Sequence, residues 1–544
     1  MLPSLLPEFA GKVDLIYIDP PFATGGDFSY TASIPDDPNT EGDQSATFVK
    51  QPSVIEQKAY RDTWGRGLDG YLEWFYGTVT LLRELLSESG SIYVHLNQEM
   101  QPFARGVMDE VFGPSNHLND VIWHFENKPK FSFSKVLPRD WEILLVYAKS
   151  NGAHKFEHQL VPVKAVQEQA VVAWDPVAKK RVAKRDEEGN IIYETRTEKL
   201  MGSVWTIPIV HPVGHERTGY PTQKPEVLLE RLLRISSDEG DLVLDCFAGS
   251  GTTAAVAEKL GRRWITCDLG RFAIHTTRKR LLGIPNVKPF VVQNLGKYER
   301  QAWQAAEFNG NAEARMRDYR EFILQLYRAQ PISGYVWLHG AKHGRMVHVG
   351  GVDAPVSTGD VTQIATEFRR AIGTGASAPT QSSVDVLGWD FAFELNEVAK
   401  QQAALAGIDV RFIRIPREVL EKKAVEQGDI RFFELAALSV DVKQNGKGVT
   451  LELKDFVIPT DEVPEDVQRA ITHWEQWIEY WAVEWDNRGD AFHNEWQAYR
   501  TRKDKTLQKR IAHSYTEPGS YNIVVQVIDI LGNETTKTLQ IEVR

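Results

Sequence analysis

Cysteine is scarce in this sequence, since only Cys246 and Cys267 occur among its 544 residues. Two cysteines are too few for a disulfide framework or a zinc site, and they suit a reducing cytosol. Long apolar runs are also missing, because no stretch reaches the roughly 18 apolar residues that a membrane span requires. Residues 1–7 lack a basic segment followed by a long apolar stretch, so we expect no signal peptide. These absences predict a cytoplasmic protein.

An excess of positive charge is absent as well. The sequence has 63 Lys and Arg against 74 Asp and Glu, which gives a net charge of −11. This balance argues against a uniformly basic surface for nucleic acid, although it allows a local basic groove. The 42% of hydrophobic and 25% of charged residues are ordinary for a globular protein, and the length predicts about three or four domains.

The most informative stretch that the sequence does contain is Asp19-Pro20-Pro21-Phe22, which follows the apolar run 13–18. An apolar run bounded by prolines predicts a buried strand that stops abruptly. Two successive prolines fix φ and remove two N–H donors, so a stiff turn should hold the Asp19 carboxylate and nearby carbonyl groups at the carboxyl edge of a sheet. A carboxylate, carbonyl acceptors and an aromatic ring suit a flat ligand with an exocyclic amino group. For the tetrapeptide alone, a turn without function explains the residues equally well.

Strands alternate with helices through the first part of the chain. Apolar positions at helical spacing predict helices over 68–86 and 103–112, and apolar runs predict strands over 91–96 and 142–147. Another strand is expected around 121–123. This alternation predicts an α/β fold with a largely parallel, doubly wound sheet.

Between residues 150 and 220 the periodicity is weak and polar residues dominate. Basic residues are concentrated in this stretch and just before it, namely Lys128, Lys130, Lys135, Arg139, Lys179, Lys180, Arg181, Lys184 and Arg185. A solvated insertion would explain them. A DNA-contacting subdomain, in which such side chains bind phosphates and set affinity and register, would explain them as well.

A glycine-rich turn forms the second motif. The stretch 249–254, Gly-Ser-Gly-Thr-Thr-Ala, fits G-x-G-x-x-G/A between a predicted strand over 242–247 and a predicted helix over 252–260. Asp268 ends the next predicted strand. Such glycines let the backbone approach a ligand, and the acid can accept hydrogen bonds from ribose hydroxyls. On these residues alone, a nicotinamide dinucleotide competes with any other adenosine-containing cofactor. A Walker phosphate loop is excluded, because no Lys-Ser or Lys-Thr ends the glycine run.

Three motifs in this order resemble the amino-methylating DNA methyltransferases: Asp-Pro-Pro-Phe at 19–22, Pro-Thr-Gln-Lys-Pro at 221–225 and Phe-Ala-Gly-Ser-Gly-Thr-Thr at 247–253. The order is similar to that of the β class, which includes the modification (Mod) subunits of type III restriction systems. The resemblance covers about residues 11–290. It implies an adenine-N6 methyltransferase that uses S-adenosylmethionine and acts on double-stranded DNA. Cytosine-N4 methylation is the sibling alternative, while a non-catalytic DNA-binding or assembly protein and a dinucleotide dehydrogenase are alternatives from other classes.

The resemblance also implies a role for each motif. Asp19 and Pro20 would receive the target amine in a catalytic turn completed by Pro21, and Phe22 would stack on the base. The implied cofactor-binding residues are Thr222, Gln223, Lys224, Asp245, Phe247, Ala248, Gly249, Ser250, Gly251, Thr252 and Asp268. Among them Asp268 would hold the ribose, and the turn 222–224 would close over the methionine end. The reaction requires no metal, and residues of about 115–220 would contain the target-recognition region. A restriction or helicase subunit and a second copy of the chain are further expected partners.

The second half of the chain resembles no known catalytic module. Beyond a methyltransferase domain over 1–295, we expect a second α/β domain over 296–440 and a helix plus a β-sandwich-like domain over 441–544. Trp474, Trp477, Trp481 and Trp485 lie three or four apart, which is typical of the buried face of a helix. Alternating apolar residues from Tyr515 to Val543 predict a hairpin of a small sandwich that is similar to polycystic-kidney-disease-type domains.

Overall fold

The computed structural model describes residues 1–21, 30–34, 47–50, 68–126, 137, 139–211, 214, 216–220, 222–293, 296–372, 379, 381–391, 407–428, 430, 432–458, 463, 465–488, 492–500 and 506–544. The chain divides into two compact units. The first contains the described residues of 1–26 and 59–287, and the second contains those of 27–58 and 288–544. Within these described ranges no helix has the length and apolar character that a membrane crossing needs.

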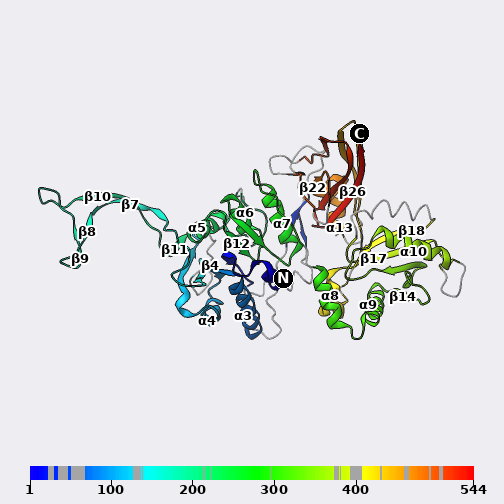
Figure 1. Cartoon of the computed structure of the whole chain (residues 1–544), viewed down its shortest axis with the longest axis horizontal. Coiled ribbons are helices and arrows are strands. Elements are labelled where there is room, and N and C mark those ends of the chain that lie inside the picture. Colours follow the sequence, from blue (N-terminus) through cyan, green and yellow to red (C-terminus); the bar gives the residue numbers. More distant parts are fainter. Residues whose placement is uncertain are drawn as a thin grey trace. The chain divides into compact units, whose positions relative to one another are not determined.

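A seven-stranded sheet forms the centre of the first unit, with the order β11-β5-β6-β4-β1-β12-β13 (Figure 1). Its strands are β1 (Val13–Ile18), β4 (Leu86–Leu96), β5 (His117–His124), β6 (Trp141–Ala148), β11 (Val204–Thr206), β12 (Leu242–Asp245) and β13 (Arg263–Thr266). β6 runs antiparallel to β4 and β5, whereas the other neighbouring pairs are parallel. The predicted α/β sheet is therefore confirmed, but as a mixed sheet. β6 is antiparallel because it returns beside its predecessor β5 without crossing over the sheet, and strands connected in this way pair antiparallel.

Hydrophobic cores lie against both faces of this sheet. The helices of the unit are α1 (Leu2–Phe9), α3 (Leu68–Leu85), α4 (Gln101–Phe112), α5 (Glu226–Ser236), α6 (Thr252–Lys259) and α7 (Arg271–Leu282), with a short 3-10 turn at Pro114–Asn116. Ile16 and Ile18 of β1 share a core with α1, α3 and α4, whereas Leu15 and Tyr17 share a second core with α5. This division follows from the strand geometry, which directs successive side chains to opposite faces. β1 is therefore fixed from both sides, and its carboxyl end is a rigid position for a functional group.

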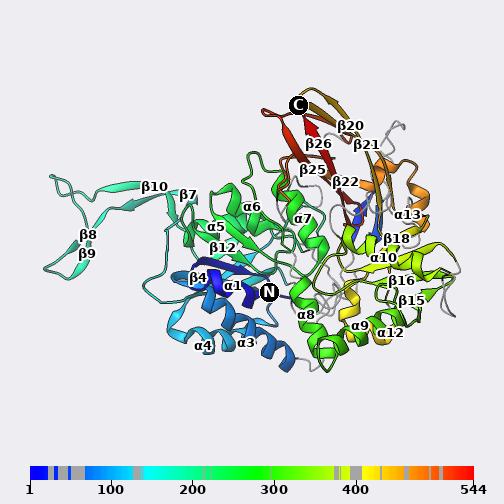
Figure 2. The ribbon, with the colours of Figure 1, turned by 45° about the vertical axis from the view of Figure 1, so that its right-hand side comes forward.

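A long two-stranded ribbon replaces regular α/β structure between β6 and α5. It consists of β7 (Leu160–Ala170) and β10 (Tyr193–Leu200), with the smaller pair β8 (Val172–Asp175) and β9 (Lys180–Ala183) at its tip. Figures 1 and 2 both show the ribbon extending beyond the strands of the sheet. Its apolar side chains are unusually open to solvent, with Trp174 63% and Val177 92% exposed. Residues this exposed do not stabilise a core, and they leave the tip available for binding.

The second unit contains a six-stranded sheet of order β14-β15-β16-β17-β18-β19. Its elements are α8 (Gly296–Glu307), α9 (Ala312–Tyr327), β14 (Gln330–Pro331), β15 (Gly340–Lys342), β16 (Arg345–Val349), α10 (Thr358–Ala371), β17 (Ser383–Gly388), β18 (Asp409–Arg414), η3 (Arg417–Leu420), α12 (Lys422–Gln427) and β19 (Phe433–Glu434). β16, β17 and β18 are parallel. α10 packs in one core with Val384 and Val386, and α9 packs in another with Val347 and Leu387. Helices therefore cover both faces of this sheet too.

Two antiparallel sheets follow, β20-β21-β24 and β23-β22-β25-β26, and they share one hydrophobic core. Their elements are β20 (Ala437–Asn445), β21 (Gly448–Val457), α13 (Glu465–Ala470), η5 (Trp474–Trp477), β22 (Ile478–Glu484), β23 (Trp496–Tyr499), β24 (Arg510–Ser514), β25 (Gly519–Asp529) and β26 (Glu534–Val543). The predicted hairpin near the C-terminus is confirmed by the β25–β26 pairing. The helix predicted for the tryptophan stripe is wrong, because Trp481 lies on β22 and Trp474 and Trp477 lie on η5. Aromatic and β-branched residues around Trp481 favour a strand, and this preference overrides the spacing of the tryptophans.

A short hairpin from the N-terminal part of the chain belongs to the second unit. β2 (Tyr30–Ser33) pairs with β3 (Thr47–Lys50), and the adjacent Ile34 is 3% exposed in the core that the two antiparallel sheets share. The chain thus enters the second unit shortly after Pro21 and is back in the first unit at α3. The segment that begins at the Asp-Pro-Pro turn is therefore anchored in the second unit.

We expect Ile34→Asp to lower the free energy of unfolding of the second unit by about 3 kcal/mol or more, because it places an unpaired carboxylate in an apolar core. Val457→Asp is the matched control, since Val457 is 54% exposed in the same unit. Urea denaturation followed by tryptophan fluorescence measures both variants, because the core contains Trp477 and Trp481. Equal stability of the two variants would contradict the packing of Ile34.

Candidate active site

The two sequence motifs meet at one edge of the central sheet. β1 pairs in parallel with β12, with Leu15 opposite Val243 and Ile16 opposite Leu244. Asp19 follows the last residue of β1, and the glycine loop follows Asp245 at the end of β12. The carboxyl ends of neighbouring parallel strands are where α/β sheets bind ligands. This register brings the Asp-Pro-Pro turn and the glycine loop together at one edge of the sheet.

Asp19 forms an ion pair with Lys224, which lies in the turn before α5. The Lys224 Nζ atom donates a hydrogen bond to Asp19 Oδ2, and the two side chains are only 12% and 18% exposed. Burial by itself would lower the pKa of Lys224, but the negative charges of Asp19 and Glu142 outweigh burial and raise it. Lys224 is therefore a permanent cation beside Asp19.

The second oxygen of Asp19 has a different environment. Asp19 Oδ1 is buried and has no hydrogen-bond partner among the described residues. An unpaired buried acceptor is costly, so such an atom in a native site calls for an explanation such as an incoming donor. Pro20 is buried and Pro21 is partly buried, whereas Phe22, the predicted stacking residue, lies outside the described residues. Asp19 Oδ1 and the Pro20 carbonyl are thus the acceptors that the turn can present to a ligand.

The glycine loop is held in a tight conformation. Gly249 and Gly251 have φ of +49° and +71°, a region that favours glycine. A Cβ atom at Gly251 would lie 2.6 Å from the hydroxyl oxygen of Thr277, so a side chain there has no space. Thr252 donates a hydrogen bond to the Lys224 carbonyl over 3.0 Å, which ties the loop directly to the turn that carries Lys224. Ser250 and Ala248 are buried within the loop.

Asp245 stabilises this loop from beneath. Its two oxygens accept hydrogen bonds from the Phe247 N–H over 2.9 Å and from the Thr253 hydroxyl over 2.6 Å. Burial raises the pKa of Asp245 to about 7, and the negative charges of Asp19 and Asp268 add to the rise. Asp245 is 3% exposed. These contacts give Asp245 a positioning role.

Asp268 also contacts the loop. Its Oδ2 atom accepts a hydrogen bond from Gly249 N–H over 2.9 Å, and its Oδ1 atom accepts one from Gly270 N–H over 2.8 Å. Each carboxylate oxygen can accept more than one hydrogen bond, so ribose hydroxyls remain possible donors to Asp268. Gln223 instead bonds within its own turn, to Thr218 and to the Glu216 carbonyl, and the Thr222 side chain is exposed.

A buried polar chain beside Asp19 was not predicted. The Tyr17 hydroxyl lies 2.8 Å from His95 Nδ1, and His95 Nε2 lies 2.8 Å from Glu142 Oε2. Burial, and then the charges of Asp19 and Asp245, raise the pKa of Tyr17, so its hydroxyl stays protonated. The signal available in the sequence was a histidine within the apolar run 91–96, since a buried polar residue is more informative than an exposed apolar one.

The predicted DNA contacts fall into three groups. Lys128, Lys130 and Lys135 lie outside the described residues. Arg139 is exposed and pairs with Glu99. Five exposed basic residues lie at the tip of the ribbon, on and around β9: Lys179, Lys180, Arg181, Lys184 and Arg185. Three acidic residues, 186–188, follow them directly, so the positive charge of the tip is local.

Comparison with known proteins identifies the first unit. Residues 13–279 match the N6/N4 family of DNA methylases. The first unit belongs to the DNA methylase family. The matched range contains the Asp-Pro-Pro turn, Lys224, the glycine loop and Asp268, and also the ribbon.

Individual relatives of this DNA methylase unit are moderately similar. The DNA adenine methyltransferase YhdJ of Escherichia coli is 27% identical over 274 residues, which cover 50% of this chain and 77% of that protein. The Mod subunit of the type III restriction-modification enzyme StyLTI of Salmonella typhimurium is 25% identical, over 52% of this chain and 53% of that protein. Among solved structures, the M1.HpyAVI–SAM complex is 18% identical with a TM-score of 0.31, and the match covers 52% of this chain and 94% of that one.

We expect Gly251→Ala to destabilise the DNA methylase unit more than Gly240→Ala does. Both glycines have positive φ, +71° and +84°, so alanine costs about 1–2 kcal/mol at either position. Only position 251 adds a clash with Thr277, because nothing lies within 4 Å of a Cβ at Gly240. Overpacking of this kind costs about 1–3 kcal/mol more. Chemical denaturation of both variants measures the difference, and equal losses would contradict the close approach at Thr277.

Proposed function

We propose that the protein is a DNA methyltransferase that transfers the methyl group of S-adenosylmethionine to the N6 amine of adenine. The single observation that carries this proposal is Asp19 Oδ1, a buried acceptor without a partner in the described part of the chain. It lies in the Asp-Pro-Pro turn of a DNA methylase unit, next to a glycine loop. The E. coli relative, a DNA adenine methyltransferase, supports adenine as the target.

The residues at this edge suit an adenosine-containing cofactor. Asp268 offers carboxylate oxygens to ribose hydroxyls, the glycine loop exposes backbone, and the partly buried ring of Phe247 offers an apolar surface. Lys224, with Thr222 and Gln223, lies in the turn that would close over the methionine end. When bound, S-adenosylmethionine supplies an electrophilic methyl group on a sulfonium. We therefore propose that the observed mixed sheet is the doubly wound, Rossmann-like methyltransferase sheet that the sequence predicts.

Asp19 and Pro20 would activate the target amine. The lone pair of adenine N6 is conjugated into the ring, which makes the nitrogen a poor nucleophile. Asp19 Oδ1 and the Pro20 carbonyl can each accept one amine hydrogen, which favours a tetrahedral nitrogen whose lone pair points away from both acceptors. The Asp19 carboxylate would stabilise the positive charge that develops on the amine during methyl transfer, and the amine would afterwards release one proton to solvent.

Lys224 would fix the orientation of Asp19 during this reaction. Its hydrogen bond occupies Oδ2, so Oδ1 is the oxygen left for the amine. The negative charge of Glu142 also raises the pKa of Lys224, and the Glu142 Oε2 atom lies 2.8 Å from His95 Nε2. A displacement of a catalytic group by about 1 Å can reduce a rate about 100-fold. The packing of the polar side chains of Tyr17, His95 and Glu142 is therefore part of the proposed mechanism.

Cytosine-N4 methylation is the second candidate function, because a cytosine N4 amine would present the same pair of hydrogens to Asp19 and Pro20. Serine in place of the aspartate is commoner among cytosine-N4 relatives, which favours adenine here. A non-catalytic DNA-binding or assembly protein would leave Asp19 Oδ1 without a function. For residues 296–440 and 441–544 we propose an α/β domain and a β-sandwich-like domain that position DNA or a restriction subunit, with a homodimer as a further assembly.

We expect Asp19→Asn to reduce methyl transfer by about 100- to 1,000-fold, because loss of one electrostatic stabiliser of the transition state has an effect of this size. Asp69→Asn is the control, since Asp69 is exposed at the start of α3. The assay uses labelled S-adenosylmethionine and duplex DNA, followed by digestion to nucleosides. N6-methyladenine would support the proposal, N4-methylcytosine would favour the second candidate, and undiminished transfer by Asp19→Asn would exclude this mechanism.

The ribbon tip gives a separate prediction about DNA affinity. Changing Lys179, Lys180, Arg181, Lys184 and Arg185 to Gln should weaken binding and flatten its salt dependence, because each lost phosphate contact reduces the slope of log K against log salt by about 0.9. Changing Glu187 and Glu188 at the same tip to Gln should not weaken binding. Fluorescence anisotropy at several salt concentrations checks both variants. An unchanged slope in the first would place the phosphate contacts elsewhere.

A further inference from the structure

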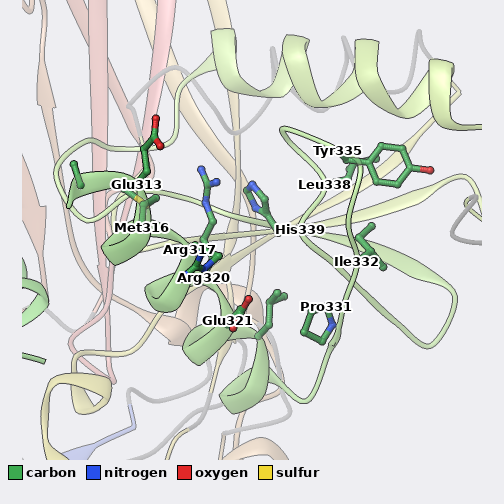
Figure 3. A pocket seen from close by; sticks show the side chains of 12 residues that line it. Glu313, Met316, Arg317, Arg320, Glu321, Pro331, Ile332, Tyr335, Leu338 and His339 are labelled. Carbon is green, nitrogen blue, oxygen red and sulfur yellow. The ribbon is translucent and has the colours of Figure 1, made fainter. Parts of the chain in front are cut away.

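A cavity of about 440 Å³ lies in the second unit, far along the chain from the methylase motifs. Its walls are one face of α9 and the segment from Pro331 to His339, which connects β14 to β15 (Figure 3). α9 contributes Met316, Arg317 and Arg320. Arg320 lies four residues after Met316 and three after Arg317, which is the spacing of neighbours on one helix surface. The volume is typical of small-molecule sites, which range over about 300–1,000 Å³.

Arg320 is the unusual residue of this cavity. Its Nε atom is buried without a hydrogen-bond partner in the described part of the chain, and no ion pair involves its guanidinium there. Burial lowers the pKa of Arg320, and the opposing effect of Tyr319 does not restore it. By contrast, Arg300 and Arg345 of the same unit pair with Asp390 and Asp385 over 2.7 and 2.6 Å. Arg320 alone of these three is left without a counter-charge.

The histidine beside Arg320 cannot supply or neutralise charge. His339 is 8% exposed, its Nδ1 atom accepts a hydrogen bond from Val349 N–H over 2.9 Å, and its Nε2 atom donates one to the Val336 carbonyl over 3.0 Å. Burial, followed by the neighbouring His348 and Arg320, lowers the pKa of His339 to about 2. His339 is therefore a neutral wall of the cavity, and Figure 3 shows it directed into the same space as Arg317.

The remaining lining residues restrict what could neutralise Arg320. Arg317 is 68% exposed and pairs with Asp318 only at the surface, where such a pair contributes little, so Arg317 can turn toward a ligand. Ile332 and Leu338 supply apolar surface. Glu313 and Glu321 lie on the same helix and would repel a ligand with several negative charges. The lining thus suits one anionic group attached to an apolar or ring-shaped body.

We propose that this cavity is a second ligand site, which binds a small organic anion through Arg320 and Arg317. Guanidinium groups bind carboxylates and phosphates through two parallel hydrogen bonds, which gives this site its specificity for the anionic group. The apolar body of the ligand lies on Ile332 and Leu338. Phosphate monoesters, such as nucleoside monophosphates, and ring-bearing carboxylates are the two sources of such an anion. The site is independent of methyl transfer at Asp19.

Calorimetric titration of the full chain tests this site with four probes: adenosine 5′-monophosphate, phenylacetate, uncharged adenosine and inorganic phosphate. S-adenosylhomocysteine is added to occupy the proposed cofactor site. We expect one of the two organic anions to bind at one per chain, at least 10-fold more tightly than adenosine or inorganic phosphate. Which of the two binds assigns phosphate or carboxylate. Binding of neither, or equal binding of inorganic phosphate, would overturn the proposal.

Substitutions connect binding to the cavity. Arg320→Gln should weaken the anion at least 10-fold, whereas Arg315→Gln, on α9 but outside the lining, should leave it unchanged. Equal affinity in the two variants would overturn the site. A ligand-free measurement gives a second check: Arg320→Met should raise the unfolding temperature of the second unit, because it removes a partly buried guanidinium whose buried Nε atom has no partner in the described part of the chain, and it breaks no ion pair there. A fall in that temperature, with Arg315→Met unchanged, would show that Arg320 already has a partner and would overturn the proposal.

Discussion

The ion pair between Lys224 and Asp19 connects three parts of the first unit that are distant in the sequence. The side chain of Lys224 reaches Asp19 after β1, while its carbonyl accepts a hydrogen bond from Thr252 at the start of α6. A buried ion pair adds little net stability, because desolvation offsets the attraction, yet removal of one partner costs about 3–5 kcal/mol. The pair therefore acts mainly as a geometric constraint. It fixes the Asp-Pro-Pro turn relative to the glycine loop, and it occupies Asp19 Oδ2 while Asp19 Oδ1 has no partner in the described part of the chain.

The same ion pair lies in a strongly acidic environment. Asp19, Glu142 and Asp245 all raise the pKa of Lys224 against the effect of burial, and Asp19 and Asp268 add to the effect of burial on Asp245. An excess of carboxylates at a sheet edge favours a cationic ligand, and a sulfonium is a cation. The pKa of about 7 for Asp245 limits this excess near neutral pH, since part of that carboxyl is then protonated. The negative charge and the geometry of this sheet edge therefore both favour S-adenosylmethionine as the ligand.

The sequence allowed the main features of this edge to be predicted, because they follow from local rules. Apolar runs ending in Pro-Pro and in a glycine turn located β1 and β12, and each motif was expected at the carboxyl end of its strand. That these two strands pair directly was seen only in the structure. The partners of Lys224 and His95 could not be predicted in this way. Lys224 meets a residue 205 positions away, and Tyr17 meets one 78 positions away, so both contacts depend on the register of the whole sheet.

Two other features of the structure differ from the sequence-based predictions because they depend on tertiary contacts. The antiparallel direction of β6 depends on how the chain returns beside β5, and the spacing of apolar residues does not determine that path. The tryptophans of 474–485 have helical spacing, yet Trp481 is fully buried on a strand, where its Nε1 atom donates a hydrogen bond to the Gln508 carbonyl. In that segment tertiary packing decided the structure, because the aromatic rings gain more from the shared core of two sheets than a helix face would provide.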